Sequence, residues 1–332
     1  MTERSVGILG VGSYVPDMIV TNEDLKKYME TSDEWIRERT GIRERRFASP
    51  EQATSDLATE AARRALQHAG VKAEEIDLII LGTVSPDMLL PSTACLVQNN
   101  IGAVNAGAFD LSAACAGFIY GLIMGSQMIK AGACKKVLVI GAETLTRIVN
   151  PSDRGTGIIF ADGAGAAVLG ETEQGFGLLS FDMGSDGSGG NLLCMPGGGS
   201  RIPATEESVR AGLHAVKMDG SEVFKFAVRI MGKTVDTSLA KAGLSKEDID
   251  VLIPHQANHR IIQSAAKRIG VAMDKVVMNV DRFGNTSAGS VPLALDEAVK
   301  EGKINDGDTV VLVGFGAGLT WASCVLKWKQ HS

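Results

Sequence analysis

Short runs of apolar residues alternate along this chain with segments of helical period. Residues 6–12 are apolar at nearly every position, as in a buried strand, whereas residues 54–70 place their apolar side chains at the spacing of an amphipathic helix. Residues 21–24 (TNED) predict the N-terminal cap of a helix that directly follows them. Because strands that are apolar at every position must be covered on both faces, the pattern predicts an α/β fold with its strands buried between helices.

The pattern occurs twice at one constant spacing. Two segments return later in the chain, residues 69–80 as residues 242–253 and residues 136–141 as residues 309–314. Asp77 and Asp250 are 250 − 77 = 173 residues apart, and the same difference separates Gly141 from Gly314. Two separate matches at one offset indicate two copies of one α/β unit, each about half the chain.

The boundary between the copies is predicted within a glycine-rich stretch. We find no linker, and residues 184–200 hold the longest loop-like segment, which marks the expected boundary. We therefore expect an N-terminal half at residues 1–183 and a C-terminal half at residues 184–332.

One cysteine lies where a short apolar run gives way to a long helical one. Residues 116–131 contain no proline and one charged residue, and they are apolar on nearly every face, which predicts a helix buried in a large domain. Cys115 would then lie at the N-terminus of this helix, where unpaired N–H groups and the helix dipole favour the thiolate. For any single cysteine, the alternative is a small core residue with no chemical role.

The duplication indicates what lies near Cys115. Adding 173 to 115 gives Ala288, within the segment NTSAGSVP at residues 285–292, so the two helix starts are equivalent. His255 directly follows a repeated strand, at the end where α/β sheets bind their ligands. If the halves pack about a pseudo-twofold axis, Cys115, His255 and Asn285 converge at the junction between them.

Composition narrows the possible partners. The chain has 332 residues, 45% of them hydrophobic, and a net charge of −6, so it lacks the positive field that attracts nucleic acid or an anionic membrane. Its five cysteines have no spacing typical of a zinc or iron–sulfur site, and their scattered arrangement suits a reducing cytosol. Residues 1–10 do not resemble a secretory leader, and no apolar run reaches the ~18 residues of a membrane span. We expect a cytoplasmic protein without a bound metal.

A charged segment at residues 30–46 contains Trp35. A solvated helix face with Trp35 packed inward is the simpler interpretation of its charges. The alternative is a nucleotide clamp, in which the indole stacks on a base and Arg39 binds phosphate oxygens. Asp162 also has two interpretations, a catalytic group or a turn-forming residue among small neighbours, and the second is favoured.

Seven motifs follow one another along nearly the whole chain. They are TSDEWIRERTGIR at residues 31–43, AACAG at 113–117, DRG at 153–155, FADGAG at 160–165, PHQAN at 254–258, GNTS at 284–287 and GFGAG at 314–318. In these motifs and their order the chain resembles the β-ketoacyl-acyl carrier protein synthase III enzymes, condensing enzymes of the thiolase fold. The resemblance implies a duplicated, five-layered αβαβα fold, a homodimer and the initiating condensation of fatty acid synthesis.

The same resemblance implies the chemistry of the site. Cys115 would take an acyl group from acyl-CoA, malonyl-acyl carrier protein would lose CO₂, and the resulting carbanion would attack the thioester on Cys115. Donor groups on His255 and Asn285 would stabilise charge on the malonyl thioester oxygen. The N–H groups of Cys115 and Ala317 would form an oxyanion hole, with alanine where the family often has glycine. The helix terminus, helped by His255, would favour the thiolate. Coenzyme A enters as a substrate, and no cofactor is implied.

The resemblance also implies how the substrates bind. Trp35 and Arg154 would hold the adenine of coenzyme A between them, Arg39 and Thr31 would contact its nucleotide end, and Asn258 would line the tunnel. Leu90 would enter the acyl pocket across the dimer interface. Many family members have phenylalanine at this position, so the primer stays open between acetyl, branched and longer acyl groups. Docking of the acidic carrier protein is implied at Lys225, Arg260, Lys267 and Arg268.

Other functions fit parts of the sequence. A related thiolase-fold acyltransferase or a ketosynthase of specialised metabolism would keep Cys115, but His255 and Asn285 together favour carbon–carbon bond formation. A non-catalytic partner of a heterodimer would be expected to lose the nucleophile. A cysteine hydrolase explains neither the duplication nor the segment around Trp35.

Overall fold

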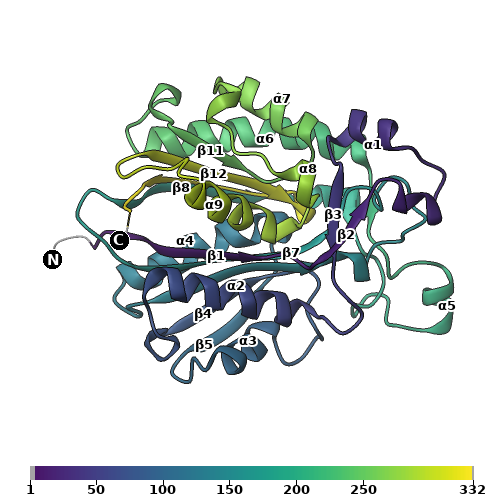
Figure 1. Cartoon of the computed structure of the whole chain (residues 1–332), viewed down its shortest axis with the longest axis horizontal. Helices are drawn as coiled ribbons and strands as arrows, with labels where there is room; N and C mark the ends of the chain where they lie inside the picture. Colours follow the sequence, from purple (N-terminus) through teal and green to yellow (C-terminus); the bar gives the residue numbers. More distant parts are fainter. Residues whose placement is uncertain (1–3, 331–332) are drawn as a thin grey trace.

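Two β-sheets lie one above the other, with helices between them and on both outer faces (Figure 1). The computed structural model describes residues 4–330. The order of layers is helix, sheet, helix, sheet, helix, which is the five-layered α/β arrangement expected for the chain. Three large apolar clusters fill the spaces between these layers.

The first sheet has the strand order β1-β7-β6-β4-β5. Its strands are β1 (Val6–Tyr14), β7 (Asp162–Glu171), β6 (Val137–Thr144), β4 (Leu78–Gly82) and β5 (Gly107–Leu111). β4 runs parallel to β5 and β6, whereas β7 is antiparallel to β6 and β1. β5 lies at the edge of the sheet, so one side of its backbone faces away from the other four strands.

The second sheet repeats this order with one strand fewer. Its strands, in the order β11-β12-β13-β8, are β11 (Val251–Pro254), β12 (Thr309–Gly316), β13 (Thr320–Lys327) and β8 (Gly177–Ser185). Where the first sheet has β5, the second has an isolated parallel bridge between Leu252 and Val276. β8 crosses the boundary expected at residue 184 and pairs along its whole length with β13, so this sheet already begins at Gly177.

Six longer helices form the helical layers. They are α4 (Gly117–Lys130) and α9 (Ser290–Lys300) between the sheets, α2 (Thr54–Ala69) and α3 (Thr93–Ile101) below the first sheet, and α6 (Gly220–Lys241) and α7 (His259–Ile269) above the second (Figure 1). α4 confirms the helix predicted at residues 116–131, and it is apolar on most of its surface because it packs against strands of both sheets. Among residues 4–330, no helix combines the length and apolar character needed to span a bilayer.

Among the shorter elements, α1, α5, α8, β2 and β3 lie toward one end of the molecule (Figure 1). The α-helices and strands are α1 (Asp33–Thr40), α5 (Glu206–Arg210), α8 (Val280–Phe283), β2 (Met18–Thr21), β3 (Glu44–Phe47), β9 (Leu193–Cys194) and β10 (Lys217–Met218). The 3₁₀ turns are η1 (Asp24–Lys27), η2 (Ala73–Glu75), η3 (Ala114–Ala116), η4 (Leu145–Arg147), η5 (Gly187–Leu192), η6 (Lys246–Asp248), η7 (Met273–Lys275), η8 (Ser287–Gly289) and η9 (Ala317–Leu319).

The prediction of a helix directly after residues 21–24 is wrong. The hydroxyl of Thr21 donates to the carboxylate of Asp24 at 2.7 Å, and the chain makes only the single 3₁₀ turn η1. The next α-helix, α1, begins at Asp33, where the hydroxyl of Ser32 accepts a hydrogen bond from the N–H of Trp35 at 3.1 Å. A cap sequence closes a local turn equally well when no long apolar face follows it.

Backbone geometry confirms the duplication. Ala114 and Ser287 have φ angles of 47° and 48°, in the left-handed region that non-glycine residues rarely adopt, and 287 − 114 = 173. The equivalent glycines Gly141 and Gly314 each lie against the opposite helix start. A Cβ at Gly141 would lie 2.1 Å from the carbonyl oxygen of Ala288, and one at Gly314 would lie 3.3 Å from that of Cys115. The two helix starts therefore pack against the two sheets in a reciprocal manner.

Candidate active site

Cys115 lies on a sharp turn between β5 and α4. The strand ends at Leu111, the backbone turns through the left-handed Ala114, and the 3₁₀ turn η3 leads into the helix. Cys115 is buried, at 7% exposure, and has small neighbours on both sides. A strained turn of this kind presents one side chain at the start of a helix, as the sequence predicted.

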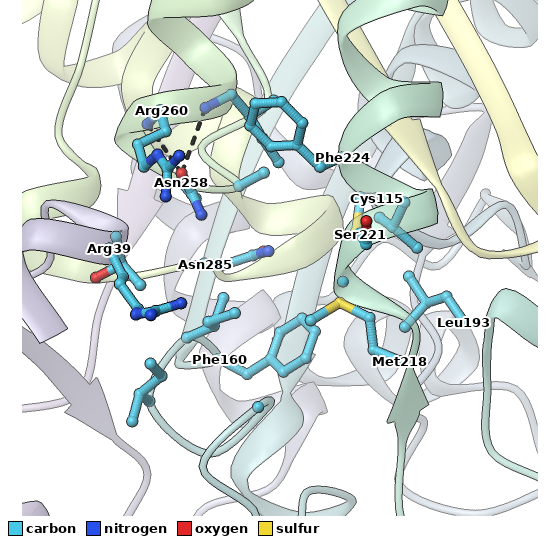
Figure 2. A pocket seen from close by; sticks show the side chains of 18 of the residues that line it. Arg39, Cys115, Phe160, Leu193, Met218, Ser221, Phe224, Asn258, Arg260 and Asn285 are labelled. Carbon is cyan, nitrogen blue, oxygen red and sulfur yellow. Dashed lines mark hydrogen bonds between the residues drawn. The ribbon is translucent and has the colours of Figure 1, made fainter. Parts of the chain in front are cut away.

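A cavity of about 740 Å³ opens above this turn and is lined by Cys115, His255 and Asn285 together. The three residues come from η3, from the end of β11 and from the segment before η8. Figure 2 shows Cys115 and Asn285 on two sides of this space, with the side-chain amide of Asn285 pointing into it. The structure thus places the three predicted residues in one cavity, and their chemical roles stay predictions.

Asn285 presents hydrogen-bond donors to the cavity. Its backbone bridges to the segment of Phe160, since the Asn285 N–H donates to Ile159 at 2.9 Å and its carbonyl accepts from Ala161 at 2.9 Å. Its side-chain Oδ1 accepts from the N–H of Ser287 at 2.8 Å. Because the oxygen accepts from the backbone of Ser287, the NH₂ group is the end that faces the cavity.

His255 is fixed from the side away from the cavity. Its backbone N–H donates to the backbone carbonyl of Val313 at 2.7 Å, and the ring nitrogen Nδ1 lies 2.7 Å from the hydroxyl oxygen of Ser290. The ring of Phe315 packs edge-on against the imidazole, with a centroid distance of 5.4 Å. Burial lowers the pKa of His255 to about 3, so the imidazole is neutral at physiological pH.

Cys115 is a neutral thiol in this state of the protein. Burial raises the pKa of the Cys115 thiol to about 12, and the carboxylate of Glu143 acts in the same direction. This shift opposes the effect expected from the helix terminus and from His255, because removal of water disfavours a charge more strongly than a short 3₁₀ turn favours it, and the neutral imidazole adds no positive charge. A nucleophilic attack by Cys115 would therefore need its proton to leave as the new bond forms.

Glu143 is a buried carboxylate at the end of β6 that the sequence did not single out. It accepts hydrogen bonds from the hydroxyls of Thr83 and Ser85, at 3.1 and 2.5 Å, and from the N–H groups of Val84 and Ser85. Burial raises the pKa of its carboxyl. Glu143 holds the loop after β4 against β6, behind the turn that carries Cys115.

The predicted nucleotide site lies at the outer end of the same cavity. Trp35, Arg39, Arg154 and Asn258 all line it, whereas Thr31 does not. The guanidinium of Arg154 lies 4.3 Å from the centroid of the Trp35 ring, and that of Arg39 lies 4.8 Å from it. A base stacked between two planar groups needs about 7 Å, two contacts of about 3.5 Å each. The Arg154 side chain would therefore have to move for the predicted stacking of an adenine between it and Trp35.

The remaining predicted residues lie around the entrance or away from it. Lys225 and Arg260 line the cavity, and Lys267 and Arg268 lie farther along α7. Gly316 lines the cavity, and Ala317 follows it in η9. Leu90 is 83% exposed in the loop before α3 and lies outside the cavity of this single chain.

Asp162 is a structural residue. Its carboxylate accepts from the N–H of Ala48 at 2.7 Å and from both the N–H and the hydroxyl of Thr146. It does not line the cavity. The favoured interpretation from the sequence, a residue that fixes a turn, agrees with these contacts.

Several lining residues were missed by the sequence analysis. They are the apolar side chains of Leu193, Met218 and Phe224, which surround the space in Figure 2 together with Phe160 of the motif at residues 160–165. Met218 and Leu193 belong to the small β9–β10 pair, whose two residues per strand carry no periodic signal. Ser290 was within a segment already singled out, but its contact with His255 depends on how β11 and α9 pack.

Comparison with known proteins gives a consistent result. Residues 109–187 match the family model described as 3-oxoacyl-[acyl-carrier-protein (ACP)] synthase III, and residues 239–328 match its C-terminal companion. A β-ketoacyl-[acyl-carrier-protein] synthase III of Clostridioides difficile is 58% identical over 97% of this chain and 98% of its own.

Two solved structures extend the comparison. The enzyme of the same name from Thermus thermophilus is 46% identical, with a TM-score of 0.91 over 98% of this chain and 100% of that one. The priming β-ketosynthase of the R1128 polyketide biosynthetic pathway is 37% identical, with a TM-score of 0.92 over 99% of this chain and 97% of that one.

Proposed function

The chain belongs to the β-ketoacyl-[acyl-carrier-protein] synthase III family and is an initiating condensing enzyme of fatty acid synthesis, and we propose that Cys115, His255 and Asn285 carry out its chemistry. The observation that carries this proposal is that one cavity is lined by a thiol from one half of the chain and two donor side chains from the other. A nucleophile and two donors are what a two-step acyl transfer and condensation require.

In the first step Cys115 attacks the carbonyl carbon of an acyl-CoA. A bond from Sγ to that carbon forms, the bond to the sulfur of coenzyme A breaks, and the thiol proton leaves with coenzyme A. The N–H groups of Cys115 and Ala317 would hold the oxyanion of the tetrahedral intermediate. The absence of a side chain at Gly316 supports this assignment, because a Cβ there would lie 2.5 Å from the nitrogen of Cys115 and cover its N–H.

In the second step malonyl-acyl carrier protein loses CO₂. The electron pair of the broken carbon–carbon bond attacks the acyl carbon, the bond to Sγ breaks, and a proton from water restores the thiol. The product is a β-ketoacyl-acyl carrier protein. Negative charge develops on the malonyl thioester oxygen, where the NH₂ group of Asn285 and the neutral imidazole of His255 would donate hydrogen bonds.

One incubation tests the proposal. With acyl-CoA and malonyl-acyl carrier protein, we expect CO₂ release and a product two carbons longer than the primer. Acyl transfer without CO₂ would contradict condensation and identify a related acyltransferase. If mass spectrometry found no acyl adduct on Cys115, the chain would be a non-catalytic partner instead.

We propose coenzyme A as a substrate that binds along the cavity. The aromatic ring of Trp35 and the cations of Arg39 and Arg154 at the outer end suit an adenine nucleotide, and Asn258 lines the path inward. Thr31 does not line the cavity, and its hydroxyl is buried without a hydrogen-bond partner among the described residues, so a contact with the nucleotide would need this hydroxyl to become exposed.

We propose that the acyl carrier protein docks beside the entrance. Lys225 and Arg260 flank the cavity, and Lys267 and Arg268 continue the basic surface along α7. On a chain with a net charge of −6, this is a local positive region suited to an acidic partner.

A homodimer is the proposed assembly. The open edge of β5 carries Phe109, which is 42% exposed, and the loop nearby carries Leu89 and Leu90, which are 82% and 83% exposed. An apolar group this exposed marks an interaction surface. A second copy would cover it and would bring Leu90 to the acyl pocket of its partner.

The primer is best tested at Leu90. We expect Leu90→Phe to narrow the range of accepted acyl-CoA primers, because a phenylalanine ring is larger than the leucine side chain and would leave less room in the acyl pocket of the partner. Rates with acetyl, branched and longer acyl-CoA measure this, and an unchanged profile would remove Leu90 from the pocket. A preference for an unusual primer would favour the second candidate, a specialised ketosynthase, which the likeness to a polyketide priming enzyme supports.

We place the enzyme in the cytoplasm. The five cysteines are free thiols in the described chain, as is typical of a reducing compartment, and a catalytic thiol has to stay reduced.

A further inference from the structure

We propose that Ser290 is a positioning residue that holds the imidazole of His255 in the tautomer with its proton on Nε2. The inference rests on the proposed function, in which His255 donates a hydrogen bond to the malonyl thioester oxygen. Ser290 is the first residue of α9, is 1% exposed and does not line the cavity. It therefore acts on the substrate only through the imidazole.

The contacts of Ser290 define a small buried cluster. Its hydroxyl oxygen lies 2.7 Å from Nδ1 of His255 and accepts a hydrogen bond from the N–H of Gln256 at 3.2 Å. His255 itself is 1% exposed and Gln256 is fully buried. Since Nδ1 is occupied by Ser290 and His255 lines the cavity, Nε2 is the ring nitrogen left for the substrate.

The hydrogen-bond donors and acceptors of the Ser290 hydroxyl and of Nδ1 of His255 are all satisfied in only one tautomer of the imidazole. A hydroxyl has one proton to donate and two lone pairs to accept with. The N–H of Gln256 already uses a lone pair, and no hydrogen bond among the described residues gives the hydroxyl proton an acceptor other than Nδ1. If Nδ1 carried the ring proton, the hydroxyl proton would be buried without a partner, which is unfavourable. With the hydroxyl donating to Nδ1, each group is satisfied and the ring proton lies on Nε2.

No other neighbour of His255 in the described part of the chain determines which ring nitrogen carries the proton, so Ser290 is the residue that fixes the tautomer. The imidazole is neutral, and its aromatic neighbour Phe315 meets it with an angle of 69° between the ring planes, so that it confines the ring. No carboxylate forms a hydrogen bond or ion pair with His255 within residues 4–330. A neutral hydroxyl fixes the tautomer without adding a negative charge where an oxyanion has to form.

The duplication supports a dedicated role for this pair. The positions equivalent to His255 and Ser290 in the first half are Gly82 and Gly117, since 255 − 82 and 290 − 117 are both 173. Gly82 and Gly117 touch directly, and a Cβ at Gly82 would lie 2.8 Å from the carbonyl carbon of Gly117. Where the first half has a contact between two glycine backbones, the second half has a hydrogen-bonded pair of side chains, at the place where the site needs a donor.

The tautomer affects one step more than the other. With the proton on Nε2, His255 donates to the thioester oxygen as charge develops during decarboxylation, whereas the other tautomer would direct a lone pair at that oxygen. Acyl loading does not use this donor, because the oxyanion hole at Cys115 is formed by backbone N–H groups. Loss of Ser290 should therefore slow condensation and spare loading.

The tautomer can be measured directly on the resting protein. Two-bond ¹H–¹⁵N correlation spectra of ¹⁵N-histidine-labelled wild type distinguish Nδ1–H from Nε2–H, and the His255→Gln variant identifies the signal of His255. We expect the Nε2–H pattern in wild type and a loss of that single pattern in Ser290→Ala. A wild-type spectrum with the proton on Nδ1 would overturn the inference whatever the activity of the enzyme.

Kinetics give the second readout. We expect Ser290→Ala to lower the condensation rate about tenfold or more, the effect of removing the hydrogen-bond partner of a metal-binding histidine, while acyl loading of Cys115 stays within about twofold of wild type. Ser126→Ala is the matched control, because Ser126 is equally buried in α4 and donates to the carbonyl of Ile123 at 2.8 Å, away from the cavity. Ser290→Thr keeps the hydroxyl and should restore both the tautomer and the condensation rate.

The possible outcomes separate the inference from the proposed function. Condensation by Ser290→Ala at the rate of the Ser126→Ala control would overturn the positioning role. Equal losses of loading and condensation in Ser290→Ala would also overturn it, since they indicate a structural defect. If Ser290→Ala does not fold, the wild-type spectrum and the Ser290→Thr variant decide. Failure of the proposed function itself would appear differently, as wild type that shows the Nε2–H pattern and releases no CO₂.

Discussion

The two equivalent helix starts of this protein share one backbone and carry different chemistry. Ala114 and Ser287 turn with φ angles of 47° and 48°, and a short 3₁₀ turn leads from each into a helix between the sheets. At the first turn the next residue is Cys115, which lines the cavity. At the second it is Ala288, fully buried against Gly141. The turn geometry therefore provides a place for a nucleophile, and only one of the two copies uses it.

The residues around the two turns differ in a complementary way. Gly316 leaves the N–H of Cys115 open, whereas its equivalent in the first half, 316 − 143 = 173 residues earlier, is the buried Glu143 beside Ser287. The second half supplies the donors His255 and Asn285, whose equivalents are Gly82 and Ser112. Each half has thus specialised in one part of the site, and neither half alone holds a nucleophile together with its donors.

The largest expected effect comes from removing the nucleophile. We expect Cys115→Ala to abolish acyl loading, measured as a mass increase after incubation with acyl-CoA. Adding Ala288→Cys to this variant should not restore loading, because that position is packed against β6 and does not line the cavity. Acylation of a cysteine at 288 would show that the two turns are interchangeable and would contradict the comparison.

The next largest effect comes from removing a donor supplied by the second half of the chain, which should slow condensation and leave acyl loading unchanged. We expect His255→Ala or Asn285→Ala to lower CO₂ release by about 10²–10³-fold, the usual effect of losing one donor to a developing oxyanion, while leaving acyl loading intact. Radioactive CO₂ from labelled malonyl-acyl carrier protein and mass spectrometry of the loaded enzyme measure the two steps. Condensation at the wild-type rate in either variant would show that the role assigned to that residue is wrong.

The environment of Cys115 predicts a pH dependence. A thiol with a pKa near 12 has a thiolate fraction that rises about tenfold for each pH unit below that value. Alkylation of Cys115 by iodoacetamide should therefore become about 100-fold faster between pH 7 and pH 9, followed by mass spectrometry of the peptide, with the exposed Cys95 as an internal control. A rate that levels off below pH 8 would show that the helix terminus outweighs burial.

The smallest of these effects is expected at Gly316, which leaves the backbone N–H of Cys115 uncovered. We expect Gly316→Ala to lower the rate of acyl loading about tenfold, because the added Cβ would lie 2.5 Å from the nitrogen of Cys115 and obstruct the oxyanion hole. Gly187→Ala is the control, since a Cβ there has no other atom within 4 Å. Unchanged loading in Gly316→Ala would place the oxyanion hole elsewhere.

Much of this arrangement could be predicted from the sequence. The duplication followed from two repeated strands, and because a strand ends where its sequence turns polar or small, the positions of Cys115 and His255 at element ends followed as well. Prediction failed where the signal was short. The cap at Thr21 closes only a local turn, and the two-residue strands β9 and β10 have no periodicity. The nine-residue β8 is a different case, because its pairing with β13 across the expected boundary depends on how distant segments pack.

The sequence by itself determined the repeated α/β unit, the offset of 173 residues, and which residues end the strands and begin the helices, because hydrophobic period and turn chemistry are local properties. Only the tertiary structure decided that Cys115 is a neutral thiol, that Arg154 lies against Trp35, and that Ser290 reaches His255. Burial and contact between β11 and α9 depend on how distant segments pack, and desolvation of a charged group is a property of the whole surrounding protein.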